Sequence, residues 1–537
     1  MTKDIHGARA WALVLTLVAP SGLAAPSSLV AQAPVTEPVP VERYQVGAAL
    51  PPVDPGSTLV AMTLEDAITL ATTRNLDVQT ARLTPQMQAY SLRAARAAFT
   101  PTFQATYGYN NSTNQSTSQL DGGARTTTRR QTFNTSIAQT VPWYGGRLSA
   151  NFNNSRTATN NAFSTRNPSY NSTLSFNYTQ PLLAGLRTDD QRTALQAQEI
   201  LGEMTEIQLT SQVENITDQV RAAYWNLRAT IEQIEIQRQG LEQARQLLAD
   251  NQLRVQLGTM AQIQVIQAEA QVANAEQALL NAEIQWRNQE LAFKSLIIGG
   301  ADDPLLAQTV NPVDLPTVQE QAVDIDAAIQ VALSERTDIR QQRQQREIAE
   351  LELDVTEDNR RPELDLTAAY SLQGVGGNLF DRSGLGGEPV LIQQGGYLDG
   401  LNSIADFATP TWSLSMSFSY PIGMRSAKAN LERARLQMQQ TDLALRSQEL
   451  AIVTEVTNAG LAVTDTRLQL QAAQRSRELA EESAAAEVTR FNAGVATNFE
   501  VTAAQDALTA ARLSELRALI NHINAIAEFD RVQRVGR

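Results

Sequence analysis

The sequence predicts an α+β membrane protein in which transmembrane β-strands continue into long coiled-coil α-helices, built as a tandem structural repeat. Three observations carry this prediction. The stretch from Trp412 to Tyr420 alternates large apolar residues with serine until Pro421 interrupts it, as a strand between lipid and water does. Residues 187–254 form a long run of helix-forming residues without proline. Similar segments recur in the same order in both halves of the chain.

Composition excludes several classes of function. The 537 residues include no cysteine and two histidines, His6 and His522, so thiolate chemistry, a histidine triad and a multi-histidine metal site are all disfavoured. A formal net charge of −14 disfavours nucleic acid as a partner. The glycine clusters at 374–377 and 384–387 do not lie between a strand and a helix, as a nucleotide-binding loop does. We therefore expect no enzyme, no cofactor and no metal site.

The N-terminus has the layout of an exported protein. Lys3 and Arg9 precede a short apolar run that ends in small residues, which predicts a signal peptide over residues 1–25. Residues 26–57 are rich in proline, and we interpret them as an extended arm. Since no later window offers about 20 uninterrupted apolar residues, a chain that enters a membrane must do so by strands.

Three pairs of matching segments divide the chain into two halves. Each pair keeps its order in the sequence, and the pairs are 64–78 with 325–339, 172–183 with 412–423, and 254–270 with 490–506. We therefore predict a first repeat over 58–300, a linker over 301–322 and a second repeat over 323–537.

Each repeat predicts a helical hairpin with unequal arms. A helix over 187–254 would be about 100 Å long, more than a compact core accommodates, and its apolar residues follow a coiled-coil spacing. The chain then returns as a shorter helix, over 262–297 in the first half and 498–530 in the second. We expect residues 75–99 and 338–360 to stack above these shorter arms.

Proline and glycine mark the two ends of each long helix. Pro181 and Pro421 occupy matching positions between a strand and the helix that follows it. At the other end, Arg254 and Arg490 each precede a glycine by four residues, so a cation lies in the last turn and glycine where the chain leaves the helix.

Five segments alternate between apolar residues and small polar ones. Their apolar positions are Phe103, Ala105, Tyr107 and Tyr109; Leu148, Ala150 and Phe152; Leu174, Phe176 and Tyr178; Leu364, Leu366, Ala368 and Tyr370; and Trp412, Leu414, Met416, Phe418 and Tyr420. A soluble sheet with one buried face alternates in the same way. The aromatic strand ends, the uncharged polar face and the long polar loops at 111–129 and 373–410 favour an outer-membrane barrel.

The number of predicted strands determines how a barrel could close. Open sheet edges are not tolerated in lipid, and one chain has too few strands for a wide barrel, so several chains must contribute.

Residues 129–158 predict an additional strand pair around the turn PWYGG, with no counterpart in the second half. We expect either six strands per chain in a wider barrel or an extra hairpin outside the wall.

The combination of these features resembles the TolC-like outer-membrane efflux proteins, the outer membrane factor family, over about residues 58–530. The resemblance implies a homotrimer whose strands form one transmembrane β-barrel, continued by an α-helical coiled-coil barrel in the periplasm. It implies a passive exit duct for tripartite efflux or type I secretion. The implied partners are the lipid bilayer, a periplasmic adaptor (membrane fusion) protein and an inner-membrane RND or ABC transporter.

The resemblance also assigns roles to residues at the helix tips. The adaptor-docking positions fall on Leu257, Gly258, Thr259, Ala493, Gly494 and Val495. The acidic positions that narrow the family's entrance fall on Glu500 and Ala503, of which only Glu500 is acidic. The polar lock of the family falls on Phe491, Ala496 and Gln264, so that lock cannot form as described. We expect Glu500 and Gln264 at the pore constriction.

Two alternatives remain open at the level of sequence. A secreted coiled-coil scaffold without a pore shares the helices and the export signal. A periplasmic adaptor also has a helical hairpin, although normally one hairpin rather than two equivalent ones. The exported substrate and the cognate pump are not encoded in these patterns.

Overall fold

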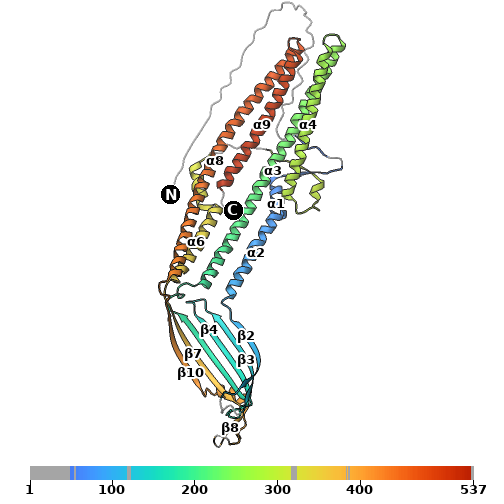
Figure 1. Ribbon diagram of the computed structural model, residues 1–537. Helices are drawn as coiled ribbons and strands as arrows, with labels where there is room; N and C mark the ends of the chain where they lie inside the picture. The colour runs from blue at the N-terminus through green and yellow to red at the C-terminus, as the bar shows by residue number, and fades with distance from the viewer. Residues whose placement is uncertain are drawn as a thin grey trace, which may run out of the picture. The chain divides into compact units, whose positions relative to one another are not determined.

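The computed structural model describes residues 49–53, 56–117, 123–315, 323–382, 384 and 387–533. The predicted signal peptide and most of the proline-rich arm lie outside these residues. Figure 1 shows the described part with a β-sheet at one end of two long helices and the helix tips at the other end.

The first half contains two short helices, four strands of one sheet, one long helix and one returning helix. In chain order these are α1 (Leu64–Arg74), α2 (Leu76–Ala97), β2 (Thr102–Gln115), β3 (Arg125–Thr140), β4 (Arg147–Thr159), β5 (Ser169–Pro181), α3 (Asp190–Gln256) and α4 (Gln262–Ile297).

The second half repeats this plan with two strands in the same sheet. Its elements are α5 (Ile325–Glu335), α6 (Thr337–Asp358), β7 (Glu363–Gly376), β8 (Leu379–Asp381), β9 (Val390–Gln393), α7 (Tyr397–Ala405), β10 (Pro410–Ser419), α8 (Arg425–Asn492) and α9 (Asn498–Gln533). The order of helices and strands therefore follows the duplication read from the sequence.

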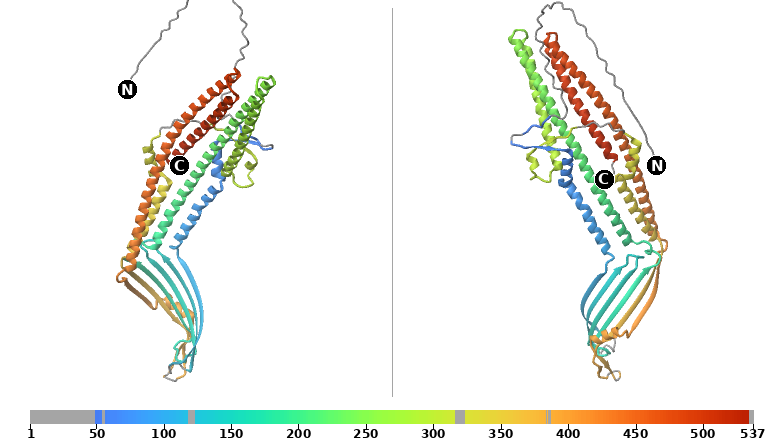
Figure 2. Two further views of the ribbon diagram at one scale, coloured as in Figure 1. Left: turned by 45° about the horizontal axis from the view of Figure 1, so that its top comes forward. Right: turned by 180° about the vertical axis from the view of Figure 1, so that it is seen from behind.

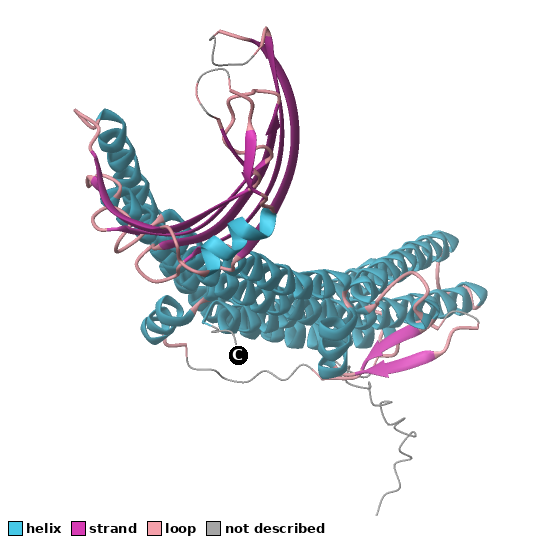
Figure 3. Ribbon diagram, turned by 90° about the horizontal axis from the view of Figure 1, so that it is seen from below, coloured by secondary structure: helices cyan, strands magenta, loops and turns pink. Residues whose placement is uncertain are grey.

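Six antiparallel strands from both halves form one sheet. Their order is β10-β7-β5-β4-β3-β2, so the predicted extra pair is the hairpin of β3 and β4, inserted within the sheet. Figure 3 shows that this sheet curves into an arc. Of the two expected arrangements, the sheet with six strands in the described residues favours the first, because the extra hairpin does not lie outside the sheet.

The strands and their loops differ from expectation in extent. Strand β2 continues to Gln115 and β3 begins at Arg125, so most of the expected loop 111–129 is strand. The expected loop 373–410 contains the β8–β9 hairpin and helix α7. Hydroxyl and amide side chains at these strand ends pair across the sheet, for example Thr113 with Thr127 at 3.0 Å between their oxygens. The polar composition of these segments therefore predicted loop where the structure has the ends of long strands.

The two long helices are α3 with 67 residues and α8 with 68. Asp189 caps the start of α3 by accepting a hydrogen bond from the Arg192 backbone N–H. The shorter helices pack along these two: α2 and α4 both contact α3, while α6 and α9 both contact α8. Both views of Figure 2 show α2 and α4 following one another along α3, as the stacking prediction requires. Within the described residues, no helix combines the length and the apolarity needed to cross a bilayer.

The apolar core lies where the short helices meet the middle of the long ones. In the first half, the Tyr224 ring lies edge-on to both Trp225 and Phe293, with centroids 5.3 and 6.1 Å away. In the second half, Ile452 and Val456 of α8 pack with Phe529 of α9. An apolar cluster therefore lies within each hairpin, and the second one also includes Ala328 and Ala332 of α5.

Part of the expected linker is folded rather than extended. Residues Pro304–Ala307 form a short 3-10 helix, and β6 (Thr309–Pro312) pairs in parallel with β1 (Leu59–Met62). Arg228 of α3 donates hydrogen bonds to the carbonyls of Pro312 and Ala49 and forms a buried ion pair with Glu232 at 2.6 Å. The linker is thereby fixed to α3 by buried polar contacts that are distant in sequence.

Candidate functional site: the helix tips and the sheet faces

The two long helices end in the same hydrogen-bonded turn. At the end of α3, the Gly258 N–H donates to the Val255 carbonyl and the Thr259 N–H donates to the Arg254 carbonyl, both at 2.9 Å. The end of α8 repeats this pattern around Gly494. The φ angles of the two glycines are 75° and 76°, a region that side chains with a Cβ atom disfavour. The paired glycines therefore lie in the turns where α3 and α8 end.

The two predicted tip arginines have different partners. The Arg254 guanidinium carbon lies 4.2 Å from the centroid of the Phe491 ring, and its Nη atoms donate to the Phe491 carbonyl and to Asn492 Oδ1. Arg490 instead pairs with Glu487 on its own helix at 2.6 Å. Both arginines lie in the last helical turn, where a cation is favourable, but only Arg254 reaches the other hairpin.

A small core lies beneath these contacts and joins the two hairpins. Phe491 is 4 % exposed and packs with Leu247 and Val501. One turn away, the amide nitrogen of Asn251 donates to Oδ1 of Asn498 at 3.0 Å, and both side chains are buried. The tips of the two halves are thus held together by one apolar cluster, one cation–π contact and three hydrogen bonds.

The predicted docking positions all lie on the exposed surface of the two tips. Neighbouring apolar side chains extend this surface. The exposed apolar side chains of the tip surface are Leu253, Leu257, Ile263, Ile266, Val495 and Phe499.

Glu500 and Gln264 occupy equivalent positions near the starts of α9 and α4. The Glu500 carboxylate accepts hydrogen bonds from the Thr497 N–H at 2.6 Å and its hydroxyl at 2.9 Å, a capping box at the start of α9. These bonds, the backbone one first, hold the pKa of Glu500 below its ordinary value. Gln264 is half-buried, and Ala261 replaces the capping threonine in the first half. Both residues lie close to the helix tips, one in each hairpin. A single chain contributes one copy of each.

Register divides the sheet into two chemically different faces. One row of cross-strand partners reads Phe103, Ile137, Ala150, Phe176, Tyr370 and Trp412. The row beside it, on the other face, reads Thr102, Ala138, Ser149, Asn177, Ala369 and Ser413. The predicted apolar positions within these strands therefore share one face, which we call the apolar face, and most of them are exposed.

The matched prolines lie at the junction of sheet and helices. Pro181 is the last residue of β5, and eight residues separate it from the start of α3. Pro421 lies between the end of β10 and the start of α8. Both prolines therefore lie where a strand ends and the chain leads to a long helix. At the same junction the β3–β4 turn exposes Trp143 and Tyr144.

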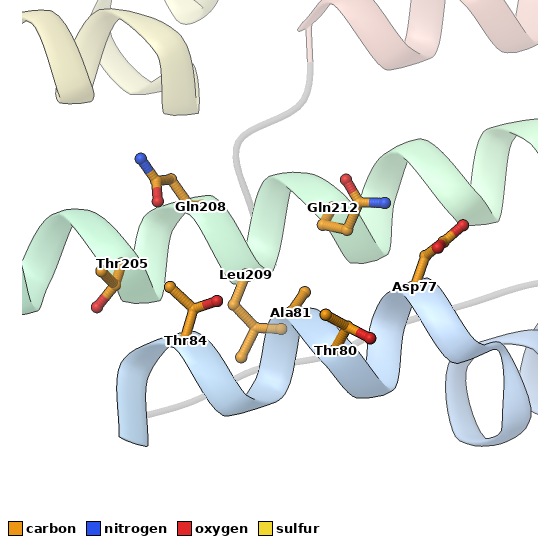
Figure 4. A pocket seen from close by; sticks show the side chains of 8 residues that line it. All are labelled: Asp77, Thr80, Ala81, Thr84, Thr205, Gln208, Leu209 and Gln212. Atoms are coloured by element: carbon orange, nitrogen blue, oxygen red, sulfur yellow. The ribbon is translucent and has the colours of Figure 1, made fainter. Parts of the chain in front are cut away.

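A groove runs between α2 and α3 (Figure 4). It is lined by hydroxyl, amide and methyl groups from both helices, and its single carboxylate is that of Asp77. Asp77 lies in the first turn of α2, where the helix dipole stabilises a negative charge. We interpret this groove as part of the helix packing rather than as a site for chemistry.

Sequence reasoning missed two features of these surfaces. It named Arg254 and Phe491 separately but did not pair them, because a contact across 237 residues leaves no local pattern. It also missed α7, which packs on β7 and β5. The glycines at 374, 376, 396 and 400 were the available signal, since such clusters in strands often mark close approach of another backbone.

Comparison with known proteins agrees with this geometry. The family model described as outer membrane efflux protein matches residues 147–299 and 328–529. A search of curated protein sequences found no match.

Several solved structures share the fold. The Campylobacter jejuni CmeC outer membrane channel is 15% identical with a TM-score of 0.62, over 88% of this chain and 86% of that chain. The outer membrane protein VceC of Vibrio cholerae is 15% identical with a TM-score of 0.62, over 88% and 95%. The Neisseria gonorrhoeae MtrE outer membrane channel is 18% identical with a TM-score of 0.57, over 88% of both chains. Since the family model covers more than half of the sequence, this chain belongs to the outer membrane efflux protein family.

Proposed function

We propose that this protein is the outer-membrane exit duct of a tripartite efflux or type I secretion system, through which substrates pass without chemical change. The observation that carries the proposal is the two-faced sheet, which has an exposed apolar face and a face of hydroxyl and amide side chains. In a closed wall, the first face meets lipid and the second lines a water-filled lumen.

The apolar face also supports a barrel with tilted strands. Phe103 and Trp412 lie in one cross-strand row. From this row, the apolar positions of β2 extend away from the helices to Tyr109, whereas those of β10 extend towards the helices to Phe418. Across five strand intervals, or roughly 24 Å, the band shifts by about six residues, or roughly 20 Å. If the band follows the membrane plane, the strands tilt by about 40°, as transmembrane strands do.

The edges of the chain support a ring of identical copies. Strands β2 and β10 each have a neighbour on one side only in the described sheet, which lipid does not tolerate. Continuous pairing of β10 with β2 of the next copy closes a wall of three copies. With six strands from each chain, this barrel is wider than one built from four.

Exposed leucines on the helices support the same closure. Leu436, Leu443 and Leu450 of α8 are exposed at a seven-residue spacing. On the opposite edge, Leu76, Leu83 and Tyr90 of α2 are exposed at the same spacing. Matching heptad stripes pack as knobs into holes, so α8 of one copy joins α2 of the next.

The helix tips support a docking role. The exposed apolar surface around Leu257, Val495 and Phe499 is suited to a periplasmic adaptor, which connects the duct to an inner-membrane RND or ABC pump. The glycine turns at 258 and 494 let a partner approach the backbone closely. In this arrangement the helices lie in the periplasm.

Two features of the tips support control of the entrance. The Arg254 contact with Phe491 joins the hairpins where the family's polar lock is absent, and we assign it the closing role. Three copies of Glu500, with Gln264 in the equivalent position, then surround the constriction and favour cations.

Two measurements on the purified full chain test the proposed duct. One is ionic conductance after reconstitution into planar phosphatidylcholine bilayers, and the other is the mass of the detergent-solubilised complex by native mass spectrometry. We expect stepwise ionic conductance and a complex of three copies. A freely soluble monomer without conductance would contradict the proposal and favour a secreted coiled-coil scaffold instead.

A further inference from the structure

Resting on the proposed place in the outer membrane, we propose that Arg129 and Arg156 form a binding site for a phosphorylated lipid headgroup at the outer border of the apolar face. The site lies beside helix α7 and uses residues that the duct itself does not require. Its occupant is a bisphosphorylated glycolipid of the outer leaflet, the chemistry that paired guanidinium groups recognise.

Register places both arginines on the lipid-facing side. Arg156 lies opposite Gln131, and Gln131 is two residues from Arg129 on the same face of β3. Neighbours in this diagonal arrangement are about 7–8 Å apart at Cα. The Arg156 side chain turns towards Tyr170 on the other side of β4, so the two guanidinium groups are placed to take one phosphate each of a bisphosphorylated headgroup. Further inward, the same face of these two strands carries Phe133 and Phe152. The arginines therefore lie just outside the apolar band, at the depth of the headgroups.

Charge around this site is unbalanced in favour of anions. The protein has a net charge of −14, yet residues 102–181 include six arginines and a single acidic residue, Asp121. Among the described residues, neither Arg129 nor Arg156 forms a salt bridge. Their positive charges are thus available to an anionic ligand, whereas the acidic remainder of the protein would repel such a ligand.

Arg156 is held in position by aromatic neighbours. Its Nε donates to the Tyr170 hydroxyl at 3.3 Å, and its guanidinium carbon lies 6.0 Å from the centroid of that ring. The Tyr170 ring in turn meets Tyr397 of α7 edge-on, with centroids 6.0 Å apart, and the Tyr397 hydroxyl donates to Oδ1 of Asn154 at 2.9 Å. This chain of contacts directs a half-buried arginine to one place instead of leaving it free in solvent.

Helix α7 completes the border of the site. The cross-strand row of Gly374, Ser172 and Asn154 lies on the apolar face, and the last two side chains are buried. A Cβ atom on Gly374 would overlap the backbone of Gly400, so glycine there lets α7 lie directly on the sheet. Leu398, which follows Tyr397 in α7, is 69 % exposed and can contact an acyl chain.

The test compares two double variants with equal changes in charge. Arg129→Glu with Arg156→Glu removes the proposed site, whereas Arg130→Glu with Arg147→Glu changes arginines on the same two strands but on the polar face. Native mass spectrometry of the detergent-solubilised complex counts bound molecules of bisphosphorylated lipid A, with inorganic phosphate as a second probe.

We expect the first variant to lose at least tenfold in apparent affinity for lipid A, and the second to bind as the wild type does. The site would be overturned if both variants bound lipid A equally well or lost affinity equally. It would also be overturned if inorganic phosphate saturated the protein at a concentration similar to that of lipid A. Conductance in phosphatidylcholine bilayers serves as the folding control for each variant. A chain that binds lipid A through these arginines but never conducts would overturn the duct and leave the lipid site standing.

Discussion

The guanidinium carbon of Arg254 lies 4.2 Å from the centroid of the Phe491 ring, and this contact joins the tips of the two sequence repeats. Arg254 ends α3 of the first repeat, and Phe491 lies in the last turn of α8 of the second. Because Arg490, the repeat equivalent of Arg254, stays on its own helix, the duplicated sequence uses the same residue type for two purposes. One arginine stabilises a helix end and the other also connects two hairpins.

We predict that Arg254→Ala weakens closure of the entrance. Loss of the cation–π contact removes roughly 0.5–2 kcal/mol between the hairpins of each copy. The fraction of time spent in conducting states in planar bilayers should therefore rise. Arg490→Ala removes the same residue type at the equivalent position without a contact between hairpins, and its gating should match the wild type. Equal gating in both variants would show that this contact does not hold the entrance.

The charge of Glu500 predicts how selectivity depends on pH. Since hydrogen bonds from Thr497 lower its pKa below the ordinary 4.5, more than half of the Glu500 carboxylates are still ionised at pH 4.5. Cation preference, measured from reversal potentials in a salt gradient, should persist there and disappear only at lower pH. Glu500→Gln should reduce the preference at neutral pH. A preference that Glu500→Gln leaves unchanged would place the selective charge elsewhere.

The tip glycines predict opposite effects of one substitution at two sites. Gly258→Ala forces a Cβ atom into a left-handed backbone and should lower the free energy of unfolding by about 1–2 kcal/mol. Gly202→Ala, in the interior of α3 with nothing within 4 Å of the added atom, should raise it by about 0.5–1 kcal/mol. Melting temperatures of the two variants should move in opposite directions from that of the wild type. A shift in the same direction would contradict the geometry of the turn.

The buried pair of Arg228 and Glu232 predicts a large loss of stability. Glu232→Ala leaves a buried, uncompensated guanidinium group, which costs about 3–5 kcal/mol. Glu478→Ala breaks the exposed pair with Arg475 and should cost less than about 1 kcal/mol. Thermal unfolding of both variants measures the difference. Similar small losses would mean that the Arg228 network does not fix the linker.

Local chemistry made much of the fold predictable. The glycine turns at 258 and 494, the proline junctions and the alternation in β10 are each set by neighbouring residues, so the sequence alone indicated them. The β3–β4 hairpin was predictable for the same reason, because its turn residues lie between two alternating runs.

Contacts between distant segments were not predictable in this way. Helix α7 is nine residues long, too short for a clear apolar period, and its position depends on glycines in another element. The pairing of β6 with β1 joins segments 250 residues apart and turned an apparent linker into a folded part. The Arg254 contact likewise depends on how two hairpins pack, which no single segment specifies.

The most direct test of the central claim is a cysteine scan along β10, in a chain that has no cysteine of its own. Each residue from Trp412 to Ser419 is replaced in turn, and labelling by a membrane-impermeant thiol reagent is measured on the protein in outer-membrane vesicles. We predict that the serine positions, which face water in the lumen, react, and that the apolar positions, which face lipid, are protected. Uniform labelling at every position, or protection of the serines instead, would contradict a wall with water on one face and lipid on the other.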